Sequence, residues 1–165
     1  MPPRVYFAGK INKNCWRHRL VRGLREHHWS LGPLHIGSLI YVGPFFVGCD
    51  HGCYHRAGNH GAVVGAICRD HDAERAAVIS RCTSAVDQCD VLLAYIDQHQ
   101  CYGTVAEIER AIIGGKHVVV AFAPGIAAPD CNEFWFVTTR VHRVEFDVAP
   151  RELPRLLHSV LENRR

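Results

Sequence analysis

Continuous apolar runs of strand length are the clearest pattern in this chain. Two of them, residues 91–96 and 117–123, are almost entirely apolar and lack the alternation of a half-exposed strand. This pattern predicts strands that are covered on both faces. Shorter β-prone segments at residues 5–8, 39–42 and 141–146 predict three further strands.

Segments with apolar residues at helical spacing separate these strands. They predict helices over residues 16–27, 72–88, 104–113 and 132–139 and from Pro150 onward. In the second of these helices, a stripe of apolar residues is expected to face the core: Ile79, Cys82, Val86 and Cys89.

The alternation of buried strands with helices is typical of a parallel sheet. The predicted fold class is therefore α/β, a three-layer sandwich with a central parallel sheet of about five strands, flavodoxin/Rossmann-like in kind. Ligands of such folds bind beyond the carboxyl ends of the strands. That rule selects the segments that follow the predicted strands: Gly9-Lys10, residues 43–46, residues 97–107 and Pro124-Gly125.

Residues 29–62 interrupt the alternation with seven glycines and two prolines. Apart from the strand at 39–42, this composition predicts a long loop, and long loops in compact domains are usually functional or disordered. The aromatic residues Phe45 and Phe46 argue against disorder. We therefore expect a single domain, residues 1–165, with a Gly-rich substrate loop at about residues 43–62.

The composition excludes several classes of protein. With 48% hydrophobic and 21% charged residues, the chain has enough apolar surface for a core, and a disordered chain is excluded. A net charge of +3 is too small for a dedicated nucleic-acid binder. No apolar run approaches the roughly 20 residues that span a bilayer, and no signal peptide is expected. We predict a soluble, cytoplasmic protein without nucleic-acid or membrane partners.

Eight cysteines and twelve histidines are more than usual for this length. Several of the cysteines occupy core-like positions, so most are interpreted as reduced, buried residues. A zinc site in the Gly-rich loop, from Cys49, His51, Cys53 and His55, is one alternative, but the spacing fits no standard closed site. A substrate-binding flap is favoured, and no metal is predicted.

The most informative segment follows the strand at 91–96, where Gly103, Thr104 and Glu107 open a predicted helix. In one interpretation, Thr104 and Glu107 form a capping box and are purely structural. In the other, Glu107 is a carboxylate in the first helical turn, where the helix dipole favours the ionised form that nucleophilic attack on a sugar carbon requires. Asp97 is the second carboxyl, available for the leaving group or for binding the sugar.

These motifs resemble those of nucleoside 2-deoxyribosyltransferases and the related deoxynucleotide N-hydrolases. The resemblance rests on four segments: Tyr6-Phe7-Ala8-Gly9, residues 90–97, Gly103-Thr104-x-x-Glu107 and Gly115-Lys116-His117-Val118. It implies that Glu107 is the nucleophile. It also implies a homo-oligomer with a shared active site, in which Asn132 either reaches the 5′-hydroxyl of a neighbour's nucleoside or is a solvent-exposed helix cap. Cys82 stands where this family often has an Asp that contacts the nucleoside.

The candidate site residues have different expected roles. Glu107 and Asp97 are the catalytic candidates. Phe45 or Phe46 is expected to stack on the base, Asp50 and His51 to bond its edge, and Lys10 to lie near a phosphate or sugar oxygen. The expected substrate-binding residues are Tyr6, Gly9, Lys10, Phe45, Phe46, Asp50, His51, Cys82, Gly103, Thr104 and Asn132.

The predicted function is cleavage and transfer at the N-glycosidic bond of 2′-deoxynucleosides, through a covalent glycosyl-enzyme intermediate on Glu107. The partners are a nucleoside or nucleotide and a nucleobase, and no cofactor is needed. One alternative is hydrolysis of a (deoxy)nucleotide or an NAD-like N-glycoside, with an anion pocket from Lys10, Arg17 or helix amino ends. Another is a non-catalytic nucleotide-sensing module with a zinc-bound loop.

Overall fold

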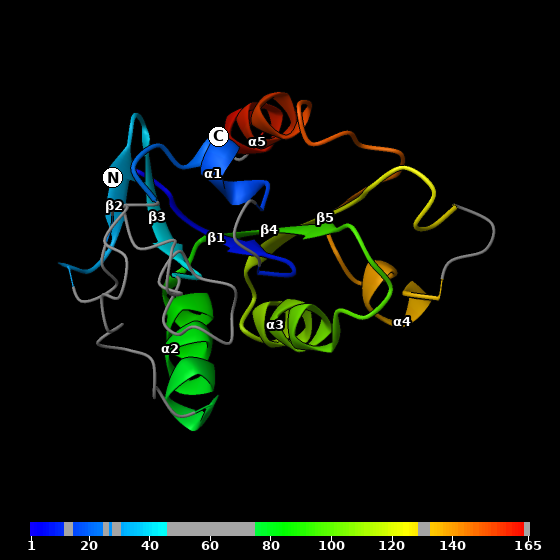
Figure 1. The fold of residues 1–165 in the computed structure, drawn as a ribbon, viewed down its shortest axis with the longest axis horizontal. Coiled ribbons are helices and arrows are strands. Elements are labelled where there is room, and N and C mark those ends of the chain that lie inside the picture. Colours follow the sequence, from blue (N-terminus) through cyan, green and yellow to red (C-terminus); the bar gives the residue numbers. More distant parts are fainter. Residues whose placement is uncertain (12–14, 25–26, 28–30, 46–74, 129–132, 164–165) are drawn as a thin grey trace, which may run out of the picture.

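A computed structural model describes residues 1–11, 15–24, 27, 31–45, 75–128 and 133–163 of the chain. Within these ranges, six strands form a sheet in the spatial order β2-β3-β1-β4-β5-β6 (Figure 1). The strands are β1 (Arg4–Ala8), β2 (Leu34–Ile36), β3 (Leu39–Gly43), β4 (Val91–Ile96), β5 (His117–Phe122) and β6 (Arg143–Glu145).

The sheet is mostly parallel, which confirms an α/β fold. β1 pairs in parallel with β3 and β4, and β5 pairs in parallel with β4 and β6. The sheet differs from the prediction in its edge strand β2, which runs antiparallel to β3. Only Gly37 and Ser38 separate these two strands, so they form a tight hairpin. The prediction missed β2 because the surrounding glycines and prolines are typical of loops.

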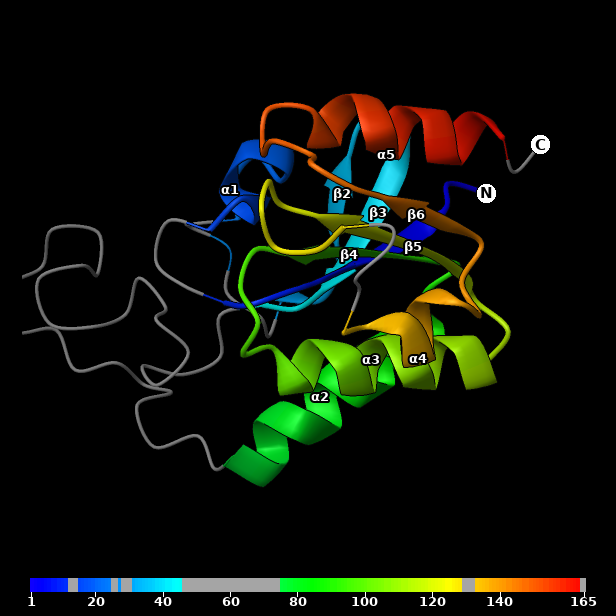
Figure 2. The ribbon, with the colours of Figure 1, turned by 90° about the vertical axis from the view of Figure 1, so that its right-hand side faces the viewer.

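Helices cover both faces of the sheet (Figure 2). On one face lie α1 (Arg17–Leu20) and α5 (Leu153–Glu162), and on the other lie α2 (Arg75–Gln88), α3 (Tyr102–Ile113) and α4 (Trp135–Thr138). Successive side chains of a strand point to opposite faces. Val5 and Phe7 of β1 therefore join the core below α1 and α5, whereas Tyr6 joins the core against α2 and α3.

The two central strands are the most deeply buried elements. All residues of β4 are buried, and so are all residues of β5 after His117. This confirms the prediction that both continuous apolar runs form strands covered on both faces. Their burial holds the carboxyl end of β4 rigidly in place, and α3 follows from that end.

The helices differ in detail from the prediction: α3 begins two residues earlier, at Tyr102, and α4 is shorter than expected, Trp135–Thr138. The helix expected over residues 16–27 is only α1, because Val21 has an extended backbone and Gly23 has a φ of 82°. The last helix begins at Leu153 rather than at Pro150. In α2, Val78 is buried and Ile79 is 62% exposed, so the predicted core stripe is wrong at Ile79.

Two further findings concern composition. Within the described ranges, no helix has the length and apolar character needed to cross a membrane. Four of the described cysteines have free thiols. Cys15, Cys89 and Cys101 are buried, and Cys82 is partly buried. For these four residues, the interpretation as reduced cysteines is confirmed.

Candidate functional site

The connections from β1 and β4 leave the sheet on opposite faces, because α1 follows one strand and α3 the other (Figure 2). In open α/β sheets, such a switch point opens a crevice at the carboxyl ends of the two strands, where ligands bind. Val5–Ala8 of β1 lie in register with Val91–Ala94 of β4, so both strands end at the same edge. The residues that follow them form the expected binding edge.

Glu107 lies on the side of α3 that faces the sheet, and its side chain is only partly exposed. The hydroxyl of Tyr6, from the middle of β1, donates a hydrogen bond of 2.5 Å to Glu107 Oε1. A bond this short is typical of a hydroxyl that donates to a carboxylate. Because Tyr6 is fully buried in the core, this bond fixes the Glu107 carboxyl relative to the sheet.

The surroundings of Glu107 change its acidity. Burial raises the pKa of Glu107 to about 7, although the Tyr6 hydrogen bond and the positive charge of Arg17 act in the opposite direction. Burial and the neighbouring Glu107 raise the pKa of Tyr6 well above its usual range, so Tyr6 stays protonated and remains a donor. A carboxyl with a pKa near neutrality is suited to act as a nucleophile or as a general acid or base.

Glu107 lines a cavity of about 580 Å³ between α2, α3 and the end of β1. Val78, Ile79 and Val86 of α2 contribute an apolar wall, while Lys10 and Thr104 contribute polar groups. Pockets for small organic ligands typically have roughly 300–1,000 Å³ and combine apolar walls with a few polar groups. The cavity in front of Glu107 matches both the size and the composition of such a pocket.

The amino end of α3 differs from the predicted capping box. The helix begins at Tyr102, and its N-cap is Cys101, without a side-chain hydrogen bond. Glu107 therefore lies in the second turn, bonded to Tyr6, and not in the first turn beside a Thr104 cap. The expected effect of the helix dipole on Glu107 is wrong for this reason, since burial raises its pKa instead. Thr104 is 4% exposed and lines the cavity.

Asp97 follows β4 directly and is partly buried. Burial raises the pKa of Asp97, while Arg17 acts in the opposite direction. Among the described residues, Gln100 and Cys101 of the same loop line the Glu107 cavity, and Asp97 does not. The described residues therefore do not bring the two predicted catalytic carboxylates together across one cavity.

Cys82 of α2 lies in the wall of the Glu107 cavity, and it shares a hydrogen bond with Tyr6. Burial and the neighbouring Glu107 raise the pKa of Cys82 to about 11, so it is a neutral thiol. Cys82 also lines a second cavity of about 350 Å³, together with Gly43 and Phe45. Phe45, the predicted stacking residue, therefore lines the neighbouring cavity and not that of Glu107.

The turn after β1 forms another wall of the Glu107 cavity, through Gly9 and Lys10. Gly9 has a φ of 150°, and a Cβ atom there would lie 2.6 Å from the carbonyl oxygen of Tyr95. Only glycine fits this approach of two backbones. Gly103 also lines the cavity, at the start of α3. Of the predicted substrate-binding residues, the structure thus gathers six around Glu107: Tyr6, Gly9, Lys10, Cys82, Gly103 and Thr104.

Several predicted site residues lie outside the described residues: Phe46, Asp50, His51 and Asn132. The same is true of the cysteines and histidines considered for zinc, at residues 49–55. Within the described ranges, no group of three or more His, Cys, Asp or Glu side chains is arranged to hold a metal ion.

Two groups that lie near the carboxyl edge of the sheet were not selected from the sequence. Thr83, adjacent to Cys82 on α2, lines the Glu107 cavity, and its position next to a candidate residue was the available signal. Cys15 lies 3.6 Å from His18 Nδ1 and 3.5 Å from a guanidinium nitrogen of Arg17. Burial raises the pKa of Cys15, but these partners outweigh burial and lower it to about 7. The spacing Cys15-x-x-His18 was the signal for that pair.

Comparisons with known proteins do not identify the chain. No family model matches it, and a search of curated proteins finds no match either. The candidate site is therefore defined by its geometry alone, through Glu107, Tyr6 and the cavity in front of them.

Proposed function

We propose that this protein cleaves the N-glycosidic bond of 2′-deoxynucleosides and transfers the sugar to a second nucleobase, as nucleoside 2-deoxyribosyltransferases do. One observation carries the proposal: the Glu107 carboxyl, held at 2.5 Å by Tyr6, lines a cavity of about 580 Å³ at the ligand-binding edge of the sheet. The motif around Gly103 and Glu107, which resembles that family, is the second support.

The finer fold assignment belongs to the same proposal. Without the antiparallel β2, the parallel strands run in the spatial order β3-β1-β4-β5-β6, which is second, first, third, fourth, fifth along the chain. This is the order of flavodoxin-like sheets, whose ligand site lies at the switch point between the first and third strands. Here those strands are β1, which carries Tyr6, and β4, which leads to α3 and Glu107.

The proposed reaction has two steps. An ionised Glu107 oxygen attacks the C1′ atom of the sugar, and the C1′–N bond breaks with its electron pair moving to the base, which takes up a proton from solvent. The sugar remains on Glu107 as a glycosyl ester. In the second step, a nitrogen of another nucleobase attacks C1′, the ester C1′–O bond breaks to release the Glu107 carboxylate, and the proton of the attacking nitrogen goes to solvent. Attack by water at this point, with loss of one of its protons to solvent, gives hydrolysis instead.

The neighbours of Glu107 have distinct parts in this mechanism. Tyr6 orients the carboxyl and stays protonated, so it stabilises the ionised form by hydrogen bonding. The apolar wall of Val78, Ile79 and Val86 limits the access of water to the ester. Cys82 remains a neutral thiol beside Tyr6 and contributes a weak donor to the same cavity.

A nucleotide substrate is the second candidate, and a specific observation favours it. Lys10 lines the same cavity as the first residues of α3, and the amino end of a helix binds anions through its free N–H groups. A 5′-phosphate at this position would place the reaction among the deoxynucleotide N-hydrolases. Arg110 also lines the cavity, but its guanidinium already forms two hydrogen bonds with Asp87.

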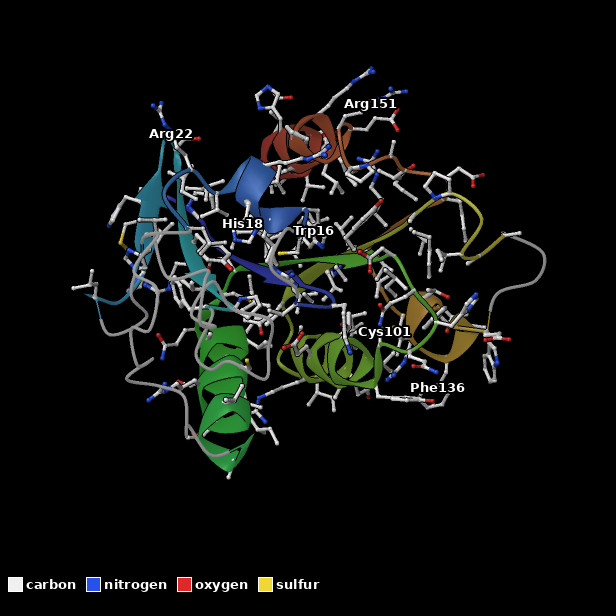
Figure 3. All side chains as sticks on the ribbon, in the orientation of Figure 1. Trp16, His18, Arg22, Cys101, Phe136 and Arg151 are labelled. Carbon is white, nitrogen blue, oxygen red and sulfur yellow. The ribbon has the colours of Figure 1, made fainter. Side chains whose placement is uncertain are left out.

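We also propose that the protein acts as a homo-oligomer. Trp135 and Phe136 of α4 are 63% and 62% exposed, which is unusual for large aromatic residues. Figure 3 shows Phe136 on the outer side of α4, away from the sheet. These two side chains support an interface at α4, next to the segment that contains Asn132.

Incubation with a panel of 2′-deoxynucleosides, with and without free adenine, tests the function. Chromatography would detect a released or exchanged base, and thymidine compared with its monophosphate would separate the two candidate substrates. We expect Glu107→Ala to abolish base release, by about a thousand-fold or more, because the substitution removes the proposed nucleophile.

Glu109→Gln is the matched control, since Glu109 lies on the same helix and pairs with Arg140 at the surface. It should retain the activity of the unmodified protein. Circular dichroism must show that both variants are folded. Equal turnover by Glu107→Ala and the unmodified protein would exclude the proposed function.

A further inference from the structure

We propose that Arg17 is a positioning residue of this site: its guanidinium clamps the turn after β1 that lines the cavity and places a buried positive charge at the edge that carries Glu107. This inference rests on the proposed function, because Glu107 is the group that the charge serves. Neither the motif around Glu107 nor the cavity itself contains Arg17.

The clamp is a set of hydrogen bonds to consecutive parts of the chain. Arg17 Nε donates to the carbonyl oxygen of Phe7 at 2.7 Å, one terminal nitrogen donates to that of Gly9 at 2.7 Å, and the other donates to that of Lys10 at 3.1 Å. One planar side chain thus holds the last part of β1 and the turn that follows it. The rigid fork of arginine is suited to such multiple bonding.

The burial of Arg17 indicates that the clamp is not an ordinary surface contact. Its side chain is fully buried, and the guanidinium lies 4.8 Å from the ring centroid of Trp16. Within the described part of the chain, no carboxylate lies within ion-pair distance of Arg17. Its nearest anionic group is the Cys15 thiol, whose sulfur lies 3.5 Å from a guanidinium nitrogen and whose pKa of about 7 leaves about half of it as a thiolate at neutral pH. Figure 3 shows Trp16 between α1 and the sheet, whereas Arg22 points to solvent.

The clamp lies directly behind the cavity wall. A Cβ atom built on Gly9 would be 3.2 Å from Arg17 Nη2, and Gly9 and Lys10 both line the cavity of Glu107. Loss of the guanidinium would therefore free the turn that forms this wall. Small displacements of such walls weaken the alignment of substrate and nucleophile.

The charge acts on the carboxyl groups of the same edge. The positive charge of Arg17 lowers the pKa of both Glu107 and Asp97, in each case against the larger effect of burial. With the charge removed, Glu107 would be protonated over a wider range of pH. A protonated carboxyl is not a nucleophile, so Arg17 supports the reaction without touching the substrate.

The two roles of Arg17 separate in two substitutions. Arg17→Gln removes the charge and most of the donors. Arg17→Lys keeps a cation but loses the fork that binds three carbonyl oxygens. Arg19→Gln is the control, because Arg19 is exposed on the same short helix.

Titration of the Glu107 carboxyl by 13C NMR, assigned by comparison with Glu107→Gln, measures the charge directly. We expect Arg17→Gln to raise the pKa of Glu107 by up to about half a unit, less than loss of the Tyr6 hydrogen bond does, because Arg17 lowers this pKa less than Tyr6 does. The acidic limb of kcat/KM should move upward with it. Arg17→Lys should leave the pKa close to its original value but raise KM by about ten-fold, through the released turn. Arg19→Gln should change neither.

Several results would overturn the proposal. An unchanged Glu107 pKa in folded Arg17→Gln excludes the charge role, and an unchanged KM in Arg17→Lys excludes the clamp. If Arg17→Gln does not fold, the test rests on Arg17→Lys. A Glu107 pKa close to its original value together with a raised KM supports the proposal, and any other combination of the two results rejects it. The NMR titration needs no substrate, so absence of base release by the unmodified protein would refute the proposed function while leaving this inference separately measurable.

Discussion

The two edges of the sheet each contain a cavity, and they differ in what surrounds the ionisable groups. At the amino edge, a cavity of about 390 Å³ is lined by Asp90, Lys116 and two histidines, among others. At the carboxyl edge, the cavity of Glu107 has one carboxylate and an apolar wall from α2. A count of acidic, basic and histidine side chains, four against three, would select the amino edge as the functional one.

The amino edge satisfies its polar groups with nearby partners. Asp90 Oδ2 accepts a hydrogen bond of 2.7 Å from the backbone N–H of Arg4, and Lys116 Nζ donates to the carbonyl oxygen of Asp87 at 2.6 Å. At the carboxyl edge, burial instead raises the pKa of Glu107 to about 7. The comparison shows that desolvation, rather than the number of charges, makes a carboxylate responsive near neutral pH.

Replacing one glycine at each edge by alanine is expected to give the largest difference in stability between the two edges. We predict that Gly9→Ala destabilises the protein by about 3 kcal/mol or more, because its Cβ atom would lie 2.6 Å from the carbonyl oxygen of Tyr95. Gly115→Ala at the amino edge should cost only about 1 kcal/mol, since its φ of 65° is unfavourable but no atom lies within 4 Å of the added Cβ. Urea unfolding of both variants measures this difference, and equal losses would contradict it.

Stability as a function of pH tests the buried carboxyl. Between its ordinary pKa of 4.5 and the folded value of about 7, the folded protein keeps a proton that the unfolded chain has released. The contribution of Glu107 to stability is therefore present at low pH and is lost as the pH rises through about 7. We predict that Glu107→Gln is more stable than the unmodified protein at pH 8, by about 1–3 kcal/mol, and that the difference shrinks toward pH 5.

Thermal unfolding at pH 5, 6, 7 and 8 provides this measurement. Asp90→Asn at the amino edge is the comparison variant, because its side chain is exposed and retains an oxygen for the Arg4 N–H. It should show no stabilisation that grows with pH. A Glu107→Gln variant that is equally destabilised at every pH would show that the carboxyl carries no desolvation cost.

The smallest predicted effect concerns Tyr6. Tyr6→Phe removes the hydrogen bond that lowers the pKa of Glu107, so less of the carboxyl is ionised at a given pH. We expect the acidic limb of kcat/KM to move upward by about half a unit to one unit, with a rate loss of about two- to five-fold at pH 7. Rates of base release between pH 5 and 9 test this; a downward shift of the limb would contradict the assigned direction. Asp90→Asn should leave the profile unchanged.

The two central strands were predictable because their signal is local, whereas the edge strand β2 was missed. The continuous apolar runs at β4 and β5 leave no surface face, so each had to be a covered strand. The rotation of α2 was not predictable in the same way, since adjacent Val78 and Ile79 are both apolar and packing alone decides which is buried. Tertiary contacts override spacing at such positions.

The candidate site was predictable in part. The spacing of Thr104 and Glu107 suits a capping box as well as an inward-facing helix, and only the true start at Tyr102 distinguishes them. Tyr6 and Glu107 lie 101 positions apart, and no local pattern reports their contact. The role of Arg17 was harder still to predict, because a charged residue on a helix is usually exposed. Its burial depends on carbonyl groups of a different element.

The Cys82 thiol lines both the Glu107 cavity and the neighbouring cavity, and its acidity decides how the cavity lining responds to oxidants. Oxidants react with thiolates, and with a pKa of about 11 only about one Cys82 side chain in ten thousand is a thiolate at pH 7. Peroxide should therefore leave Cys82 reduced. Cys15, with a pKa of about 7, is about half thiolate at the same pH, so of these two thiols Cys15 is the more reactive toward an oxidant that reaches both.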